Sequence, residues 1–366
     1  MLDKLAIIAL TAVSVRYLPR ILRKKLPITV GGSVKPGFED VRDVFRQNFE
    51  RGLESRESGS AFAVYFKGEN VVNVFGGYAD ADSQQLWREN TLSVVYSTTK
   101  AVTAVCIALL ADRGLVEYDK PVAHYWPEFA QNGKENITVE QLMEHKVFHY
   151  HRNHSSMTSC GTAPDAGPRL PLLLHCGNLG RPMDITLCPW DPWPMSCSGE
   201  WTHRDALSGG SLLRRSQSPL FKTQNNPEYR AIEIPSANGF GTAEGLAKLL
   251  GILATGGTEL TSGKKLLSRE LVDSFLDSEP ETMDKVIKLP VSWKRGMIID
   301  YSEDGGKIFG HPGAGGQVAF ADPRYQLGFA FTSRCASPFG LGDDPRYLSL
   351  QRAMYKCVKR IEGENG

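Results

Sequence analysis

The chain has 366 residues, of which 41% are apolar and 23% are charged, and its formal net charge at neutral pH is +1. This length is sufficient to bury one large hydrophobic core or two smaller ones. The balanced charge argues against a nucleic-acid partner, because proteins that bind nucleic acid carry a surplus of basic residues to neutralise phosphates. The composition is that of an ordinary soluble enzyme.

Residues 1–30 form an apolar and basic segment that we exclude from the expected fold. The apolar run 5–15 is followed by five basic residues: Arg16, Arg20, Arg23, Lys24 and Lys25. The run is shorter than a helix needs to span a bilayer. Three interpretations stay open: a secretory or anchoring signal, a presequence for mitochondrial import, or a helix that lies on a membrane surface. We favour a targeting or membrane-associating segment and a mitochondrial or membrane-associated destination.

Short apolar runs near both ends of the chain predict strands of one antiparallel sheet. They fall at residues 62–66 and 71–75 in the first group, and at 296–300, 307–309, 318–321 and 328–332 in the second. Asp304-Gly305-Gly306 has the composition of a tight hairpin turn. Helices are expected at residues 101–113, 139–145, 244–255 and 348–361. Thr242 is a suitable N-cap for the third helix, and Gly256-Gly257 would end it.

The most informative pattern comes just before the first of these helices. Ser97-Thr98-Thr99-Lys100 places a hydroxyl and an amine three residues apart, almost one helical turn, so both emerge on the same face. The amine is then close enough to take the proton of the hydroxyl, and amides at a helix N-terminus would stabilise an oxyanion. Burial would also weaken the preference of Lys100 for its charged form. The pattern favours acyl transfer, whereas a solvated lysine on an amphipathic helix is the simpler alternative.

Further stretches give this pattern its context: Ala61-Phe62-Ala63-Val64-Tyr65, Phe75-Gly76-Gly77-Tyr78, residues 137–145, Pro235-Ser236-Ala237-Asn238-Gly239-Phe240-Gly241, and Gly310-His311-Pro312-Gly313-Ala314-Gly315-Gly316. With them the chain resembles the serine beta-lactamase-like proteins, which include class C beta-lactamases, penicillin-binding proteins, Ser-x-x-Lys esterases and animal beta-lactamase domain-containing proteins. The resemblance covers about residues 35–146 and 230–360. It implies an α+β fold of the beta-lactamase/transpeptidase type over residues 35–365, with an antiparallel sheet flanked by helices and a second, mostly helical region.

His311-Pro312-Gly313 resembles the third motif of this family, which lies on a strand beside the active site. The resemblance implies that His311 contacts a substrate carboxylate or carbonyl, or assists the leaving group. Gly313 would let a ligand lie close to the strand, and the amide of Ala314 would join that of Ser97 as an oxyanion donor. The simpler alternative is a glycine-rich bend between two strands.

The second motif of the family supplies a tyrosine, and the sequence has none between Tyr150 and Tyr229. The expected position falls within residues 147–222, which are rich in proline and follow neither a helical nor a strand period. We therefore predict that residues 147–222 are an atypical, disordered segment that interrupts the domain. The hypothesis is that unusual splicing or a translated intron has replaced the exon with the tyrosine, which sequencing of the dominant transcript would test.

The same segment contains two patterns that resemble metal ligands only in part. His149-Tyr150-His151-Arg152-Asn153-His154 approaches a dinuclear zinc signature, but an asparagine stands where that signature has an aspartate. The segment also has four cysteines without a Cys-x-x-Cys pair: Cys160, Cys176, Cys188 and Cys197. We expect free thiols, no metal site and no cofactor.

The expected function is that of a serine hydrolase that acts on an ester, amide or lactam through an acyl-enzyme on Ser97, with Lys100 as base. The substrate would be a small-molecule or peptide acyl compound, and a homo-oligomer stays open. The missing tyrosine leaves the leaving group without an evident proton donor, which could lower the rate by about 100-fold. The alternative is a catalytically weak or inactive scaffold or assembly protein, in which Ser97 and Lys100 are inherited structure.

Overall fold

The computed structural model describes residues 26–146, 185–186 and 234–363, except 279, 285, 286, 288, 336 and 338–341. The predicted N-terminal segment 1–30 and the predicted atypical segment 147–222 therefore lie largely outside the described residues, as do His149–His154 and the four cysteines named with them. None of the helices within the described ranges is both long and apolar enough to cross a membrane.

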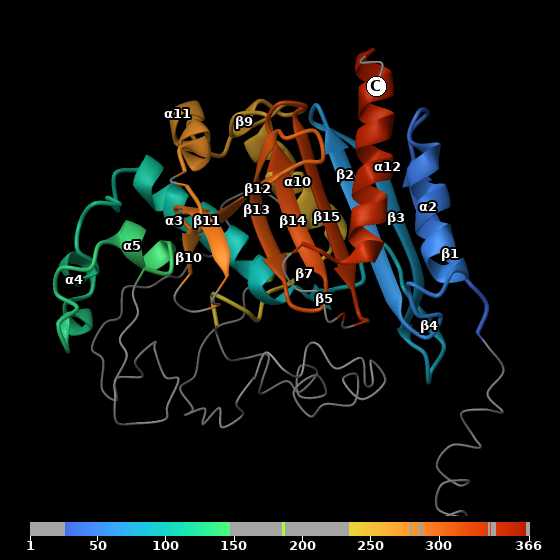
Figure 1. Cartoon of the computed structure of the whole chain (residues 1–366), viewed down its shortest axis with the longest axis horizontal. Coiled ribbons are helices and arrows are strands. Elements are labelled where there is room, and N and C mark those ends of the chain that lie inside the picture. The colour runs from blue at the N-terminus through green and yellow to red at the C-terminus, as the bar shows by residue number, and fades with distance from the viewer. Residues whose placement is uncertain are drawn as a thin grey trace, which may run out of the picture.

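An antiparallel sheet of ten strands, counted over the described residues, forms the centre of the fold (Figure 1). Its order is β1-β3-β2-β15-β14-β13-β12-β11-β10, with β4 beside β3. The strands are β1 (Val30–Val34), β2 (Gly59–Phe66), β3 (Glu69–Asp80), β4 (Gln85–Leu86), β10 (Thr282–Met283), β11 (Pro290–Lys294), β12 (Met297–Tyr301), β13 (Lys307–Gly313), β14 (Gln317–Asp322) and β15 (Leu327–Ser333). β2 pairs with β15, so the first and last parts of the chain share one sheet, as the sequence predicts.

Helices and short strands surround this sheet. They are α2 (Glu39–Glu50), β5 (Ser93–Val94), η1 (Tyr96–Thr98), α3 (Thr99–Asp112), α4 (Val122–Tyr125), η2 (Pro127–Ala130), α5 (Val139–Met143), β6 (Ile185–Thr186), β7 (Phe240–Gly241), α10 (Ala243–Ala254), β8 (Thr258–Glu259), β9 (Lys264–Lys265), α11 (Arg269–Asp273), η4 (Ser274–Leu276) and α12 (Pro345–Glu362). Thr242 caps α10 by accepting a hydrogen bond from the amide of Gly245 at 3.0 Å, which confirms the predicted N-cap.

The two faces of the sheet differ in side-chain size. Large residues such as Phe62, Phe320 and Phe329 pack under α2 and α12, which lie side by side in Figure 1. The opposite face has alanines from β2, β14 and β15, and it packs against α3 and α10. A Cβ at Gly328 would lie 2.0 Å from the amide nitrogen of Gly251 in α10, so only a glycine there permits this close approach. The small side chains on this face thus allow α3 and α10 to lie close to the sheet.

The sequence does not predict β1, α2 or β11, and it places the start of β12 one residue too early. Arg295 and Gly296 have φ angles of +50° and +87° and form a two-residue turn between Lys294 and Met297. Such turns need the left-handed conformation at both central positions, which is unusual for arginine. The turn makes β11 and β12 a hairpin, and β11 supplies Trp293 to the site described below.

A buried arginine joins the start of α12 to the turn after β13. Arg346 is 3% exposed, and its guanidinium donates to both oxygens of Glu54, to Asp344, to Ser333 Oγ and, at 3.1 Å, to the carbonyl of Gly315. These contacts satisfy two carboxylates that are themselves 1% exposed. A buried carboxylate without its partner is strongly unfavourable.

We expect Arg346→Met to lower the free energy of unfolding by about 3–5 kcal/mol, because it leaves Glu54 and Asp344 buried without a cation. The matched control is Arg352→Met on the same helix. Arg352 pairs with Glu303 where both side chains are more than half exposed, so its loss should change the free energy by less than about 1 kcal/mol. Urea unfolding of both variants measures the difference, and equal destabilisation would contradict the assignment.

Candidate active site

Ser97 and Lys100 meet where the turn η1 leads into α3. The Oγ atom of Ser97 lies 3.2 Å from the Nζ atom of Lys100, which also donates a hydrogen bond to the carbonyl of Ser236 at 2.8 Å. Tyr96, just before the serine, has a φ of +46°, a rare and strained value for a residue with a side chain. The described residues therefore present the predicted hydroxyl beside the predicted amine.

Burial changes the acidity of Lys100. Loss of solvent lowers its pKa to about 8, and the negative charge of Asp284 opposes this shift only in part. At neutral pH most of the amine is still protonated, but a minor fraction is neutral and able to accept a proton.

The stretch before α10 holds Lys100 in place, a role that the sequence analysis does not give it. Thr103 Oγ1 donates to the carbonyl of Pro235 at 2.6 Å, and the amide of Gly239 donates to Thr99 Oγ1 at 3.0 Å. A Cβ at Gly239 would lie 2.8 Å from that same hydroxyl oxygen, so the stretch lies directly on α3. This contact presents the carbonyl of Ser236 to the Lys100 amine.

The end of β13 lies against η1. A Cβ at Gly313 would lie 2.5 Å from the carbonyl oxygen of Val95 and 3.1 Å from the amide nitrogen of Thr98, so glycine is required at this position. Ala314 follows as an exposed residue in the turn before β14. The predicted third motif is thus a strand end beside Ser97, rather than only a bend between strands.

His311 is 5% exposed on β13 and is electrically neutral at ordinary pH. Burial, aided by the positive charge of Lys100, lowers its pKa to about 3. Its Nδ1 atom donates to the carbonyl of Pro312, which fixes the tautomer and leaves a lone pair on Nε2. Within the described residues Nε2 has no hydrogen-bond partner, although it is buried. The side chain therefore offers an unused acceptor near Lys100.

A second histidine lies in the same region, and the sequence analysis gives it no chemical role. His145 Nδ1 is 3.2 Å from Oδ2 of Asp284, and the same oxygen accepts a hydrogen bond from Trp293 Nε1 at 2.9 Å. The Trp293 ring is close to two imidazoles, 4.3 Å from that of His145 and 5.5 Å from that of His311, centre to centre. No local sequence signal connects these residues, because His145 lies in the turn after α5, Trp293 in β11 and Asp284 in the loop before β11.

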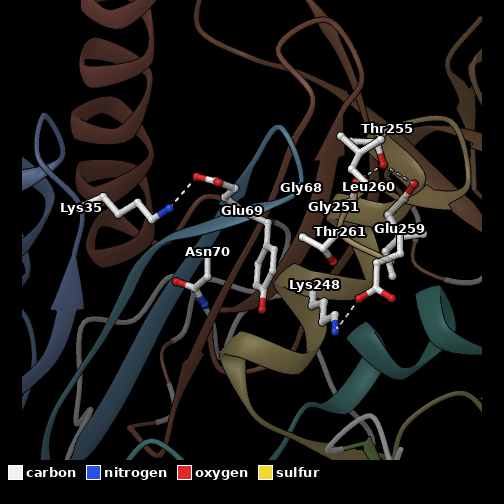
Figure 2. A pocket seen from close by; sticks show the side chains of 12 residues that line it. Lys35, Gly68, Glu69, Asn70, Lys248, Gly251, Thr255, Glu259, Leu260 and Thr261 are labelled. Carbon is white, nitrogen blue, oxygen red and sulfur yellow. Dashed lines mark hydrogen bonds and ion pairs between the residues drawn. The ribbon is translucent and has the colours of Figure 1, made fainter. Parts of the chain in front are cut away.

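A cavity of about 330 Å³ lies elsewhere, between the β2–β3 turn, α10 and β8 (Figure 2). Its charged side chains neutralise each other in two pairs, Lys35 with Glu69 and Lys248 with Glu259. None of the residues that line it belongs to the group around Ser97. Nor do the described ranges contain a cluster of three or more His, Cys, Asp or Glu side chains able to hold a metal ion.

The chain is similar to known proteins in sequence and to solved structures in fold. The chain is 28% identical over 382 aligned residues to the esterase/beta-lactamase LipL of Mycobacterium tuberculosis, and the alignment covers 88% of this chain and 87% of LipL. A penicillin-binding protein homologue from Caulobacter crescentus superimposes with a TM-score of 0.68 and 29% identity, over 90% of this chain and all of that one. A family VIII carboxylesterase gives 0.67 and 29% over the same fractions.

These structures confirm the α+β fold of the beta-lactamase/transpeptidase type. The family model described as Beta-lactamase matches residues 45–155 and 190–353. Within the segment 147–222 that the sequence marks as atypical, the family model matches residues 147–155 and 190–222 and leaves residues 156–189 unmatched. Since the match spans more than half of the sequence, the chain belongs to the Beta-lactamase family.

Proposed function

We propose that the chain is a serine hydrolase that transfers the acyl group of an ester, amide or lactam to Ser97 and then to water. The observation that carries this proposal is the 3.2 Å contact between Ser97 Oγ and a Lys100 amine whose pKa is lowered to about 8. The similarity to an esterase/beta-lactamase and to a carboxylesterase supports the reaction class. The acyl donor would be a small molecule or a peptide.

In the first step the neutral amine of Lys100 takes the proton of Ser97 while Oγ attacks the carbonyl carbon. The carbonyl oxygen becomes an oxyanion, for which we propose the amides of Ser97 and Ala314 as donors. The bond to the leaving group then breaks, and the leaving group departs with the proton held by Lys100. Water later attacks the acyl-enzyme, releases the acid and restores Ser97.

His311 would bind a donor group of the substrate. The Nε2 atom carries the lone pair, because Nδ1 already donates to the Pro312 carbonyl. A neutral imidazole in this tautomer accepts from an N–H or O–H group, and it cannot donate to the carboxylate or carbonyl that the sequence resemblance implies. We therefore propose Gly313 and His311 as the wall that orients the substrate, with the hydrogen bond running from substrate to His311.

A catalytically weak or silent scaffold or assembly protein is the second candidate, and the absence of any tyrosine between Tyr150 and Tyr229 favours it. We keep as further proposals the targeting or membrane-associating role of residues 1–30, a mitochondrial or membrane-associated destination, one domain over residues 35–365 interrupted at about 147–222, and a homo-oligomer.

A fluorophosphonate probe and a penicillin-type probe test the proposed hydrolase, with the adduct located by mass spectrometry. We expect an adduct on Ser97, formed faster as the pH rises through about 8, because the Lys100 amine must be neutral to accept the proton. Labelling on other residues, or none from folded protein, would favour the scaffold. Reaction with the penicillin-type probe would add lactams to the substrates.

A further inference from the structure

His145 has the environment of a proton acceptor. Its imidazole packs 4.3 Å from the ring of Trp293, and its Nδ1 is 3.2 Å from a carboxylate oxygen of Asp284. The Asp284 side chain is fully buried, and Trp293 Nε1 and the amide of Ile287 also donate to it. A carboxylate fixed in this way holds the neighbouring imidazole with its Nδ1 proton toward the acid, so that Nε2 carries the lone pair.

Burial keeps His145 neutral, and the charged groups around it act in both directions. Asp284, from the loop before β11, favours the imidazolium, whereas Lys100 from α3 disfavours it; the uncharged imidazole of His311 belongs to the same group. Glu144, which precedes His145 in the chain, is paired with Lys146, which follows it. Burial is the largest effect, and the net result is a pKa of His145 below its usual value of 6.5. Near pH 7 this imidazole is therefore unprotonated, while most of Lys100 is protonated.

We propose that His145, oriented by Asp284, is the second proton carrier of the site and the base that deprotonates the hydrolytic water. This inference rests on the proposed hydrolase function. The water gives one proton to Nε2 as its oxygen bonds to the acyl carbon. The bond from that carbon to Ser97 Oγ then breaks, and Oγ takes the proton from the imidazolium. The acid leaves, and both side chains return to their starting state.

The pair thus gives the site a second proton carrier, which serves the attack of water on the acyl-enzyme. Lys100 alone would have to serve both half-reactions, and its amine is already engaged by Ser97 and by the carbonyl of Ser236. With a second base that is neutral at the pH of the reaction, a different residue can serve each half-reaction. Acylation then depends on Lys100, and deacylation depends on His145.

The experiment is stopped-flow hydrolysis of p-nitrophenyl acetate by the full chain carrying His145→Asn. Asparagine suits the left-handed conformation of this position, where φ is +55°, and its amide can still donate to Asp284, but it does not titrate. The matched control is His124→Asn, on an exposed histidine of α4. Fluorophosphonate labelling of Ser97 reports acylation chemistry separately from turnover.

In His145→Asn we expect the acylation burst and the labelling of Ser97 to persist, while deacylation slows by about 100-fold. The wild-type deacylation rate should fall as the pH drops through the lowered pKa of His145, and the variant should lose this acid limb. Asp284→Asn should give a partial loss of the same step, and His124→Asn should match the wild type.

Four outcomes would overturn the inference. Deacylation in His145→Asn at the wild-type rate and with the wild-type pH profile would exclude a proton-carrying role. Equal loss of burst, labelling and deacylation would assign His145 a structural role only. A wild type that labels at Ser97 but never deacylates would leave the nucleophile in place and remove the proposed base. If instead the folded wild type neither labels nor turns over, the hydrolase function itself is wrong, and the role of His145 fails with it.

Discussion

Ester hydrolysis by the Ser97→Ala variant is expected to fall by about 1000-fold or more. The mutation removes the only atom to which the acyl group can transfer in the proposed mechanism, and loss of a nucleophile has effects of this size or larger. The hydroxyl of half-buried Ser97 contacts the Lys100 amine, and its removal takes away a single atom, so the fold should stay intact. Steady-state hydrolysis of p-nitrophenyl esters, with circular dichroism to check folding, measures both expectations.

The matched control is Ser83→Ala, in the exposed turn between β3 and β4, which should hydrolyse the ester at the wild-type rate. A Ser97→Ala protein that retains hydrolysis within tenfold of the wild type would show that another group attacks the ester. The proposed role of Lys100 as its base would then have no support.

The Lys100→Met variant is expected to lose about 10²–10⁴-fold in the rate of acylation, because methionine fills a similar space but cannot accept the Ser97 proton. Lys248→Met is its control, since Lys248 pairs with Glu259 at the separate cavity of Figure 2. Fluorophosphonate labelling rates measure the effect. A Lys100→Met protein labelled as rapidly as the wild type would exclude the amine as base.

The Lys100→Met variant should be at least as stable as the wild type at neutral pH. A loss of activity in this variant would then reflect the missing amine and not unfolding. The pKa of Lys100 is near 8 in the folded protein, below its ordinary value of 10.5. Between these two values the unfolded chain binds more protons than the folded one, so the stability of the wild type rises with pH there. Urea unfolding of Lys100→Met should lack this rise.

Local patterns were sufficient for much of the fold. Glycine turns and apolar runs located β12 to β15, and the spacing of Ser97 and Lys100 on one helical face gave the contact observed between them. The sequence analysis missed α2 although its buried residues Val41, Phe45 and Phe49 recur every four positions, as in an amphipathic helix. It missed the hairpin of β11 and β12 because Arg295 has the left-handed conformation of a turn residue.

The rest of the candidate site depends on tertiary structure. His145 and Asp284 are 139 positions apart, and only the placement of α5 beside β11 brings them together. The pKa of His311 likewise depends on its burial on the sheet and on its distance from Lys100, neither of which a motif specifies. The sequence could therefore name the proposed nucleophile and its nearest partner, but it could not identify the second imidazole.

The pairing of β2 with β15 also determines when this protein can fold. Leu327 lies opposite Phe66 and Ser333 opposite Ser60, so the sheet joins only after nearly the whole chain has left the ribosome. Contacts this distant in sequence make folding slow. Until then β2 exposes an unpaired edge to other nascent chains, a source of aggregation that a chaperone would have to cover. Because Gly313 packs against η1 from the same late-made part of the sheet, truncation before β13 would leave Ser97 without this neighbouring strand.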